Sequence, residues 1–169
     1  MAEEIINRVE KSGIIQFDLE DWLKDLQLVE MDISEFLVEG FLLREKDFRQ
    51  KIKDFDWQQF EGKTLILTNK DEAITTTWAI MLIASELHEI GGTFYFGTKS
   101  DFYNHYISQR IENLNLSEYQ DARIIIKGCG KYDLDDNLYA QFVEKIQPVA
   151  KVLMFGEACS SVPVFKKKV

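Results

Sequence analysis

Hydrophobic and polar residues form alternating blocks along this chain that fit strands and helices in turn. Short apolar runs typical of buried strands occur at Thr64 to Thr68, Thr93 to Phe96, Ala122 to Ile126 and Lys151 to Phe155. Between these runs, apolar residues recur every three or four positions, which predicts helices. Because parallel strands need long crossover connections, this alternation predicts a parallel sheet with right-handed crossovers.

The three connecting segments carry signals for helix ends. Thr77 to His88 is apolar over most of its surface, which predicts a deeply buried helix. The next helix is expected to begin at Ser100 as its N-cap, because a serine side chain can accept a hydrogen bond from the first turn. The third is expected to be capped by Asp135 or Asp136 and closed by Pro148.

The N-terminal third shows shorter patterns. Ile5 or Ile6 pairs with Val9 at helical spacing. The elements predicted here are a helix at residues 2–11, strands at Ile14 to Phe17 and Leu26 to Ile33, and a helix from Arg44 to near Asp54. The predicted fold class is α/β: a three-layer αβα sandwich in one domain over residues 1–169, with a mostly parallel sheet of four core strands plus one or two N-terminal strands.

Composition and charge exclude some classes of function. Apolar residues make up 46% and charged residues 29% of the chain, which is ordinary for a globular protein. The formal net charge is −9, and phosphate contacts need clustered Lys and Arg, so we expect no nucleic-acid partner. The longest apolar run, Trp78 to Ala84, has seven residues and is too short to cross a membrane. We therefore expect a soluble, cytoplasmic, acidic protein with no membrane partner.

Candidate chemistry gathers after the predicted strands. The carboxyl ends of parallel strands meet at one edge of a sheet, where open α/β proteins bind their ligands. The residues expected there are Asn69, Cys129, Glu157, Cys159 and Ser160. We predict a catalytic role for the two cysteines and a ligand-binding role for Asn69, Glu157 and Ser160. The alternative for the cysteines is that they are small apolar fillers beneath the loops.

The cysteines differ in their surroundings. Cys129 lies between Lys127 and Lys131, whose charges would lower its thiol pKa and favour a nucleophilic or redox thiolate. Glu157 lies two residues before Cys159 and would raise the pKa of that thiol instead. The two cysteines are 30 residues apart with no CxxC motif, which favours reduced thiols in the cytoplasm.

Metal and phosphate sites have weaker support. His88 and His105 fall within predicted helices, away from the expected edge, so no metal site is predicted. The segment Lys127 to Asp133 offers two glycines and two lysines ahead of a helix, which suits an anion nest. Neither GxGxxG nor GxxxxGK[ST] is present, so a nucleotide is not predicted and the cofactor is left unknown.

Five motifs are found along the chain: LREKDFR (Leu43 to Arg49), DWQQFEGK (Asp56 to Lys63), EAITTTWAIML (Glu72 to Leu82), KGCG (Lys127 to Gly130) and MFGEACSSVPVFK (Met154 to Lys166). Together they resemble a bacterial family of uncharacterised proteins, domain of unknown function 2480. The resemblance runs across nearly the whole chain, and it implies no particular activity. This chain departs from the family pattern at Asn69, where that pattern has a cysteine. A site built from the family's cysteines would therefore lack one member here.

Two functions of different classes follow from these observations. The first is a small-ligand or thiol site at the carboxyl edge of the parallel sheet, with a small molecule as partner. The alternative is a non-catalytic binding or oligomerisation module, for which a homodimer is expected. Whether the chain is an enzyme is left open by its sequence.

Overall fold

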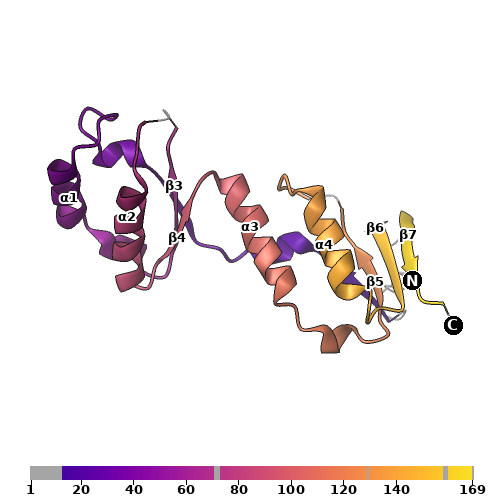
Figure 1. The fold of residues 1–169 in the computed structure, drawn as a ribbon. Coiled ribbons are helices and arrows are strands. Elements are labelled where there is room, and N and C mark those ends of the chain that lie inside the picture. Colours follow the sequence, from indigo (N-terminus) through magenta and orange to yellow (C-terminus); the bar gives the residue numbers. More distant parts are fainter. Residues whose placement is uncertain (1–12, 71–72, 129, 158–159, 169) are drawn as a thin grey trace, which may run out of the picture. The chain divides into compact units, whose positions relative to one another are not determined.

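The computed structural model describes residues 13–70, 73–128, 130–157 and 160–168 (Figure 1). Internal contacts divide the chain into two compact units. Unit 1 consists of Met1–Lys24 and Tyr103–Val169, and unit 2 consists of Asp25–Phe102. Each unit has its own sheet and is described by itself. The predicted helix at residues 2–11 lies outside the described residues, and the single domain stays a prediction.

Unit 2 is built on a parallel sheet of three strands in the order β2-β3-β4. Each strand is joined to the next through helices, as parallel pairing requires. The strands are β2 (Leu28–Asp32), β3 (Thr64–Thr68) and β4 (Thr93–Phe96), and the α-helices that connect them are α1 (Glu45–Asp54) and α2 (Thr77–Glu89). Short 3-10 helices flank α1 at Ile33–Phe36 (η3) and Trp57–Phe60 (η4).

The core of unit 2 lies between one face of this sheet and the two α-helices. Leu65 and Leu67 of β3 are both 0% exposed and belong to the same cluster of buried side chains as Phe48 of α1 and Ile83 of α2. The prediction that α2 is deeply buried is wrong, because Met81 is 65% exposed. The buried residues of α2 recur every four positions and so form one stripe, namely Ala79, Ile83 and Leu87.

Unit 1 is built on a sheet in the order β1-β5-β6-β7. Its first three strands are parallel, and β7 is antiparallel to β6. The strands are β1 (Ile14–Phe17), β5 (Arg123–Ile126), β6 (Val152–Glu157) and β7 (Ser160–Lys166). The helices are η2 (Leu19–Leu23), α3 (Lys99–Glu112), which begins in unit 2, η5 (Leu116–Tyr119) and α4 (Asp136–Ile146).

Side chains of unit 1 pack between its sheet and α4. The ring of Phe17 in β1 lies 4.4 Å from the ring of Phe142 in α4, centroid to centroid. Phe155 of β6 makes an edge contact with Tyr139 of α4 at 5.8 Å. The prediction that Asp135 caps α4 is confirmed, because its side chain accepts a hydrogen bond from the backbone N–H of Asn137 at 2.8 Å.

The mixed α/β class and the parallel pairing of the predicted strands are confirmed, but the arrangement differs in two ways. The strands form two sheets instead of one, because β3 pairs with β2 and β4 whereas β5 pairs with β1 and β6. The sheet of unit 1 also has a strand that was not predicted: the chain after β6 turns back as β7, pairing Glu157 with Ser160 and Gly156 with Ser161. Pro163 fits β7 because that strand lies at the sheet edge.

Candidate functional site

The predicted site residues follow strands of two different sheets. Asn69 directly follows β3 of unit 2, whereas Lys127 follows β5 and Glu157 ends β6 in unit 1. Cys129 and Cys159 lie outside the described residues, so their chemistry stays a prediction. The described site residues therefore belong to two separate carboxyl edges, one in each unit.

Asn69 holds the chain that leaves β3. Its side-chain amide donates to the carbonyl oxygen of Ala73 at 2.9 Å, and its amide oxygen accepts from the backbone N–H of Ala73 at 2.8 Å. Both polar atoms of the side chain are thus engaged by the backbone four residues further on. This pairing gives Asn69 a structural role at the edge where a ligand-binding role is predicted.

A cavity of about 460 Å³ opens at the carboxyl edge of the unit 2 sheet. It combines residues from β2, from the end of β3 and from the connection between β4 and α3. We call it the carboxyl-edge pocket. Its lining residues are Glu30, Thr68, Asn69, Lys70, Phe96, Gly97, Thr98, Lys99 and Asp101.

Charged groups of both signs line the carboxyl-edge pocket. The ammonium of Lys99 lies 3.5 Å from a carboxylate oxygen of Glu30, and both side chains are partly exposed to solvent. Such exposed pairs contribute about 0–1 kcal/mol, so an incoming anion can exchange for Glu30 at little cost. Lys70 adds a second ammonium, and Phe96 adds an aromatic ring that is 39% exposed.

The start of α3 forms one wall of this pocket. The N-cap predicted at Ser100 is wrong: α3 begins at Lys99, and Thr98 and Asp101 cap each other reciprocally. The carboxylate of Asp101 accepts from the Thr98 hydroxyl at 2.6 Å and from its backbone N–H at 3.0 Å, and these bonds lower the pKa of Asp101. The Asp101 N–H in turn donates to the Thr98 hydroxyl at 3.2 Å.

Asp32, at the end of β2, was not among the predicted site residues, yet it joins the start of η3 to the end of β3. Its carboxylate accepts from the backbone N–H of Ser34 at 2.9 Å, the N–H of Lys70 at 3.0 Å and the hydroxyl of Thr68 at 3.0 Å. Partial burial acts to raise the pKa of Asp32, but these hydrogen bonds outweigh it and lower the pKa to about 2. Asp32 thereby fixes the segment that carries Lys70.

The anion nest considered as an alternative in Lys127 to Asp133 is filled by the protein itself. The two carboxylate oxygens of Glu20 accept hydrogen bonds from the backbone N–H groups of Lys131 and Tyr132, each at 2.9 Å. A Cβ atom added at Gly130 would lie 1.8 Å from a Glu20 oxygen. The nest is therefore built around the carboxylate of Glu20 and is not open to an external anion.

The lysine before Cys129 also has an internal partner. The ammonium of Lys127 lies 3.8 Å from a carboxylate oxygen of Asp18, and its backbone N–H donates to the carbonyl of Phe17 at 2.9 Å. Asp18 offsets part of the positive charge that was expected to stabilise a Cys129 thiolate. Glu157 and Ser160, the other predicted residues of this edge, are exposed and pair across the β6–β7 hairpin.

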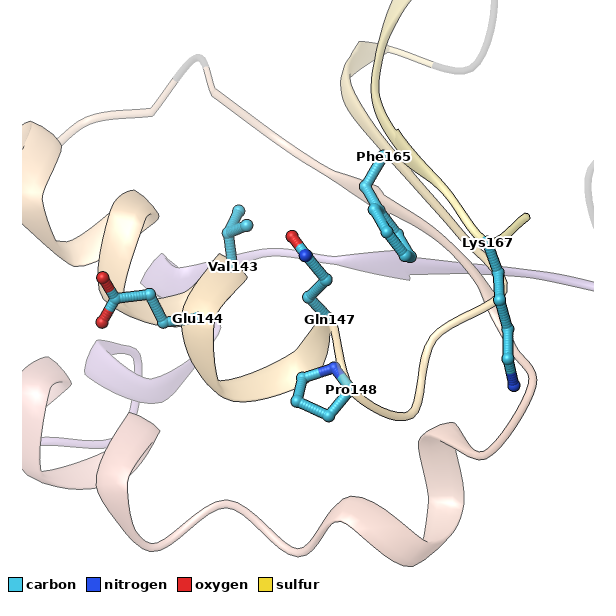
Figure 2. A pocket seen from close by; sticks show the side chains of 6 residues that line it. All are labelled: Val143, Glu144, Gln147, Pro148, Phe165 and Lys167. Atoms are coloured by element: carbon cyan, nitrogen blue, oxygen red, sulfur yellow. The ribbon is translucent and has the colours of Figure 1, made fainter.

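A second cavity of about 460 Å³ lies between the end of α4 and β7 in unit 1 (Figure 2). Figure 2 shows the Phe165 ring of β7 and the side chain of Gln147 beside the same space. Gln147 precedes β6, so this cavity lies at the amino edge of the sheet, away from the predicted site. Its cation, Lys167, is paired with Asp121 at 3.0 Å. The carboxyl-edge pocket is lined by more charged side chains than this cavity, namely Glu30, Lys70, Lys99 and Asp101 against Glu144 and Lys167.

In the described ranges, no three or more His, Cys, Asp and Glu side chains are grouped so that they could hold a metal ion. No helix in that part of the chain combines the length and the apolar character needed to cross a membrane.

Similarity to known proteins assigns this chain to a family. No curated protein and no solved structure matches it. A family model described as "Protein of unknown function (DUF2480)" matches residues 3–167, which is nearly the whole chain. The motifs from Leu43 to Lys166 noted above lie within that match. The chain therefore belongs to the DUF2480 family.

Proposed function

We propose that unit 2 binds a small organic anion in the carboxyl-edge pocket. The observation that carries the proposal is the position and size of this cavity. Ligand pockets are typically about 300–1,000 Å³, and in open α/β sheets they lie at the carboxyl ends of the strands. At about 460 Å³, the carboxyl-edge pocket suits a ligand with one ring or a short chain.

The lining residues support this class of ligand. Lys70 and Lys99 present ammonium groups to the cavity, and the exposed ring of Phe96 offers an apolar surface. A carboxylate or phosphate on the ligand would take the place of Glu30 beside Lys99. An aromatic or aliphatic group would pack on Phe96, because apolar contact removes that ring from water.

The position of Lys70 supports its part in recognition. Its backbone N–H is held by Asp32, and the preceding Asn69 is held by Ala73. A binding group on a fixed backbone loses less conformational freedom when a ligand arrives, which favours affinity. Asp32 and Asn69 therefore act as positioning residues in this proposal.

A titration tests the proposal with phenyl phosphate and benzoate as probes, and with benzyl alcohol as a neutral control. We expect both anions to bind and Lys70→Glu to weaken them by roughly tenfold or more, since a hydrogen bond to a charged group contributes about 1.5–3 kcal/mol. Lys46→Glu on α1 makes the same charge change at an exposed position outside the pocket and should leave affinity unchanged. If both variants lost affinity equally, the loss would be caused by the change in overall charge. That result would contradict the proposal.

Thiol chemistry at the carboxyl edge of unit 1 is a second proposal. The chain on both sides of Cys129 is anchored, by the Lys127 N–H on Phe17 and by the Lys131 N–H on Glu20. Lys127 and Lys131 supply positive charge near the thiol, as a nucleophilic or redox cysteine requires. The two cysteines and the net charge of −9 also support a cytoplasmic setting and argue against a nucleic-acid partner.

A further inference from the structure

The cavity between α4 and β7 in unit 1 has walls that are held by backbone pairing. On one side, the backbone N–H of Gln147 donates to the carbonyl of Val143 at 2.9 Å and continues the hydrogen bonding of α4 to the end of that helix. On the other side, Phe165 of β7 pairs with Leu153 of β6. The space of about 460 Å³ between these walls is therefore preformed, and a ligand that enters it would not have to order the chain.

Apolar side chains account for half of the residues that line this α4–β7 cavity, namely Val143, Pro148 and Phe165. All three keep some of their surface exposed to solvent. A flat ring in the cavity would pack on the Phe165 ring, in the offset or edge-on arrangement that aromatic pairs prefer. It would also remove these apolar surfaces from water, which is favourable. The cavity is therefore suited to an aromatic ring.

The charged side chains of the cavity are turned away from this apolar surface. The ammonium of Lys167 is hydrogen-bonded to the carboxylate of Asp121 at 3.0 Å, and Figure 2 shows it pointing away from the Phe165 ring. The carboxylate of Glu144 also points away from Gln147 and Phe165 in Figure 2. A charged group on the ring would thus leave water without meeting an opposite charge among these lining residues, which is unfavourable. This arrangement favours a neutral ligand.

Gln147 supplies hydrogen bonding beside the ring. Figure 2 shows its side chain extending from the end of α4 toward the space beside Phe165. In the part of the chain that the structure describes, no hydrogen bond engages this side chain, so its N–H groups and its oxygen are open to a ligand. An amide donates and accepts side by side, and it pairs best with a group that accepts and donates in the matching order. A second carboxamide is such a group.

We propose that the α4–β7 cavity binds a neutral aromatic carboxamide, with its ring on Phe165 and its amide paired with that of Gln147. The carbonyl oxygen of the ligand accepts from a Gln147 N–H, and a ligand N–H donates to the Gln147 oxygen. A carboxylate or a ketone of the same shape has no N–H and can make only the first of these bonds. The site lies in unit 1 and takes a neutral ligand, so it is separate from the anion site proposed in unit 2.

An amide NMR titration of the full chain with benzamide and with acetophenone tests this proposal. The two probes share a ring and a carbonyl group, but acetophenone has a methyl group in place of the NH2. We expect benzamide to cause saturable shifts at the side-chain amide of Gln147 and at the backbone amides of Phe165 and Lys167. Acetophenone should bind about threefold more weakly or worse, because it loses one hydrogen bond. Equal affinities, or benzamide shifts that do not saturate or that centre on unit 2, would overturn the proposal.

The variant Gln147→Met removes the amide and keeps a side chain of similar volume. We expect it to weaken benzamide by about fivefold or more and to abolish the difference between the two probes, since neither can then bond to residue 147. Gln58→Met makes the same change at an exposed position outside the cavity and should leave both affinities unchanged. Lys70→Glu should also leave benzamide binding unchanged, which separates this site from the anion site. A preference for benzamide that persists in Gln147→Met would overturn the proposal, and the comparison of probes on the wild type decides the matter if that variant does not fold.

Discussion

The carboxylate of Glu20 occupies the place that a side chain at Gly130 would need. A Cβ atom at position 130 would lie 1.8 Å from Glu20 Oε1, well inside van der Waals contact. These residues are 110 positions apart, and the same carboxylate accepts the N–H groups of Lys131 and Tyr132. The segment after β5 is thus shaped by an acid from η2.

Gly130→Ala should displace Glu20 and lose both hydrogen bonds. Hydrogen bonds to a charged group contribute about 1.5–3 kcal/mol each, so we expect the loss of both to lower the free energy of unfolding by about 3 kcal/mol or more. Urea denaturation measures this loss. In a Glu20→Ala background the same substitution should cost little, because its clash partner is gone. Additive costs of the two substitutions would contradict the coupling of Glu20 with this segment.

Asp32 should make the stability of the fold depend on pH. Its folded pKa of about 2 lies below the usual value of 3.8, so its stabilising contribution is fully present above about pH 4 and is lost as the pH falls toward 2. Because the group is partly exposed, we discount the effect of this shift to about 1 kcal/mol. Asp32→Asn should therefore lower the free energy of unfolding at pH 7 by about this amount.

The measurement for Asp32 is urea denaturation of both proteins from pH 7 to pH 2. We expect the difference between wild type and Asp32→Asn to shrink below pH 4 and to approach zero near pH 2. A difference that stays constant across this range would mean that the charge of Asp32 is not what stabilises the fold. Asp25→Asn changes the same charge at an exposed position and serves as the control.

Asn69 should contribute to stability through its amide group. Asn69→Ala removes both hydrogen bonds to Ala73, and at about 0.5–1.5 kcal/mol each we expect a loss of roughly 1–3 kcal/mol. Asn69→Asp keeps the oxygen that accepts from the Ala73 N–H and should lose about half as much. Hydrogen exchange at the Ala73 amide reports the bond directly. Unchanged protection of this amide in Asn69→Ala would refute the role.

The thiol proposal makes a prediction about charge. Asp18→Asn frees the Lys127 ammonium, which should lower the pKa of the Cys129 thiol and speed its alkylation by iodoacetamide at pH 7 severalfold. Cys129→Ser and Cys159→Ser identify the reacting thiol, and Asp25→Asn is the control. If the folded protein reacts no faster than an unfolded sample, and Asp18→Asn does not change this, neither cysteine is activated.

The local elements of this fold are readable from sequence because short-range patterns encode them. The apolar run of β3, the stripe of Phe48 and Ile52 and the Asp135 cap all depend on neighbours within a few residues. The choice of sheet is not local. β5 pairs with β1, which lies more than 100 positions earlier in the chain. Nothing in the sequence of either strand indicates that β5 pairs with β1 and not with β4.

The site illustrates the same limit. The site residues were predicted to gather at one carboxyl edge, but they follow strands of two sheets, and of the described ones Asn69 lines the unit 2 pocket. Asp32 was not identified, because its contacts with Lys70 and Thr68 span 38 and 36 residues. One local signal did exist: Asp32 stands two residues before Ser34, the spacing at which an aspartate side chain accepts a backbone N–H.

The central claim is that the carboxyl-edge pocket of unit 2 binds a small organic anion, and an amide NMR titration with phenyl phosphate tests it most directly. The account predicts saturable shifts concentrated at the backbone amides of Lys70, Gly97 and Thr98, which line the pocket. Shifts that do not saturate, or that centre on the α4–β7 cavity around Gln147 and Phe165, would contradict it.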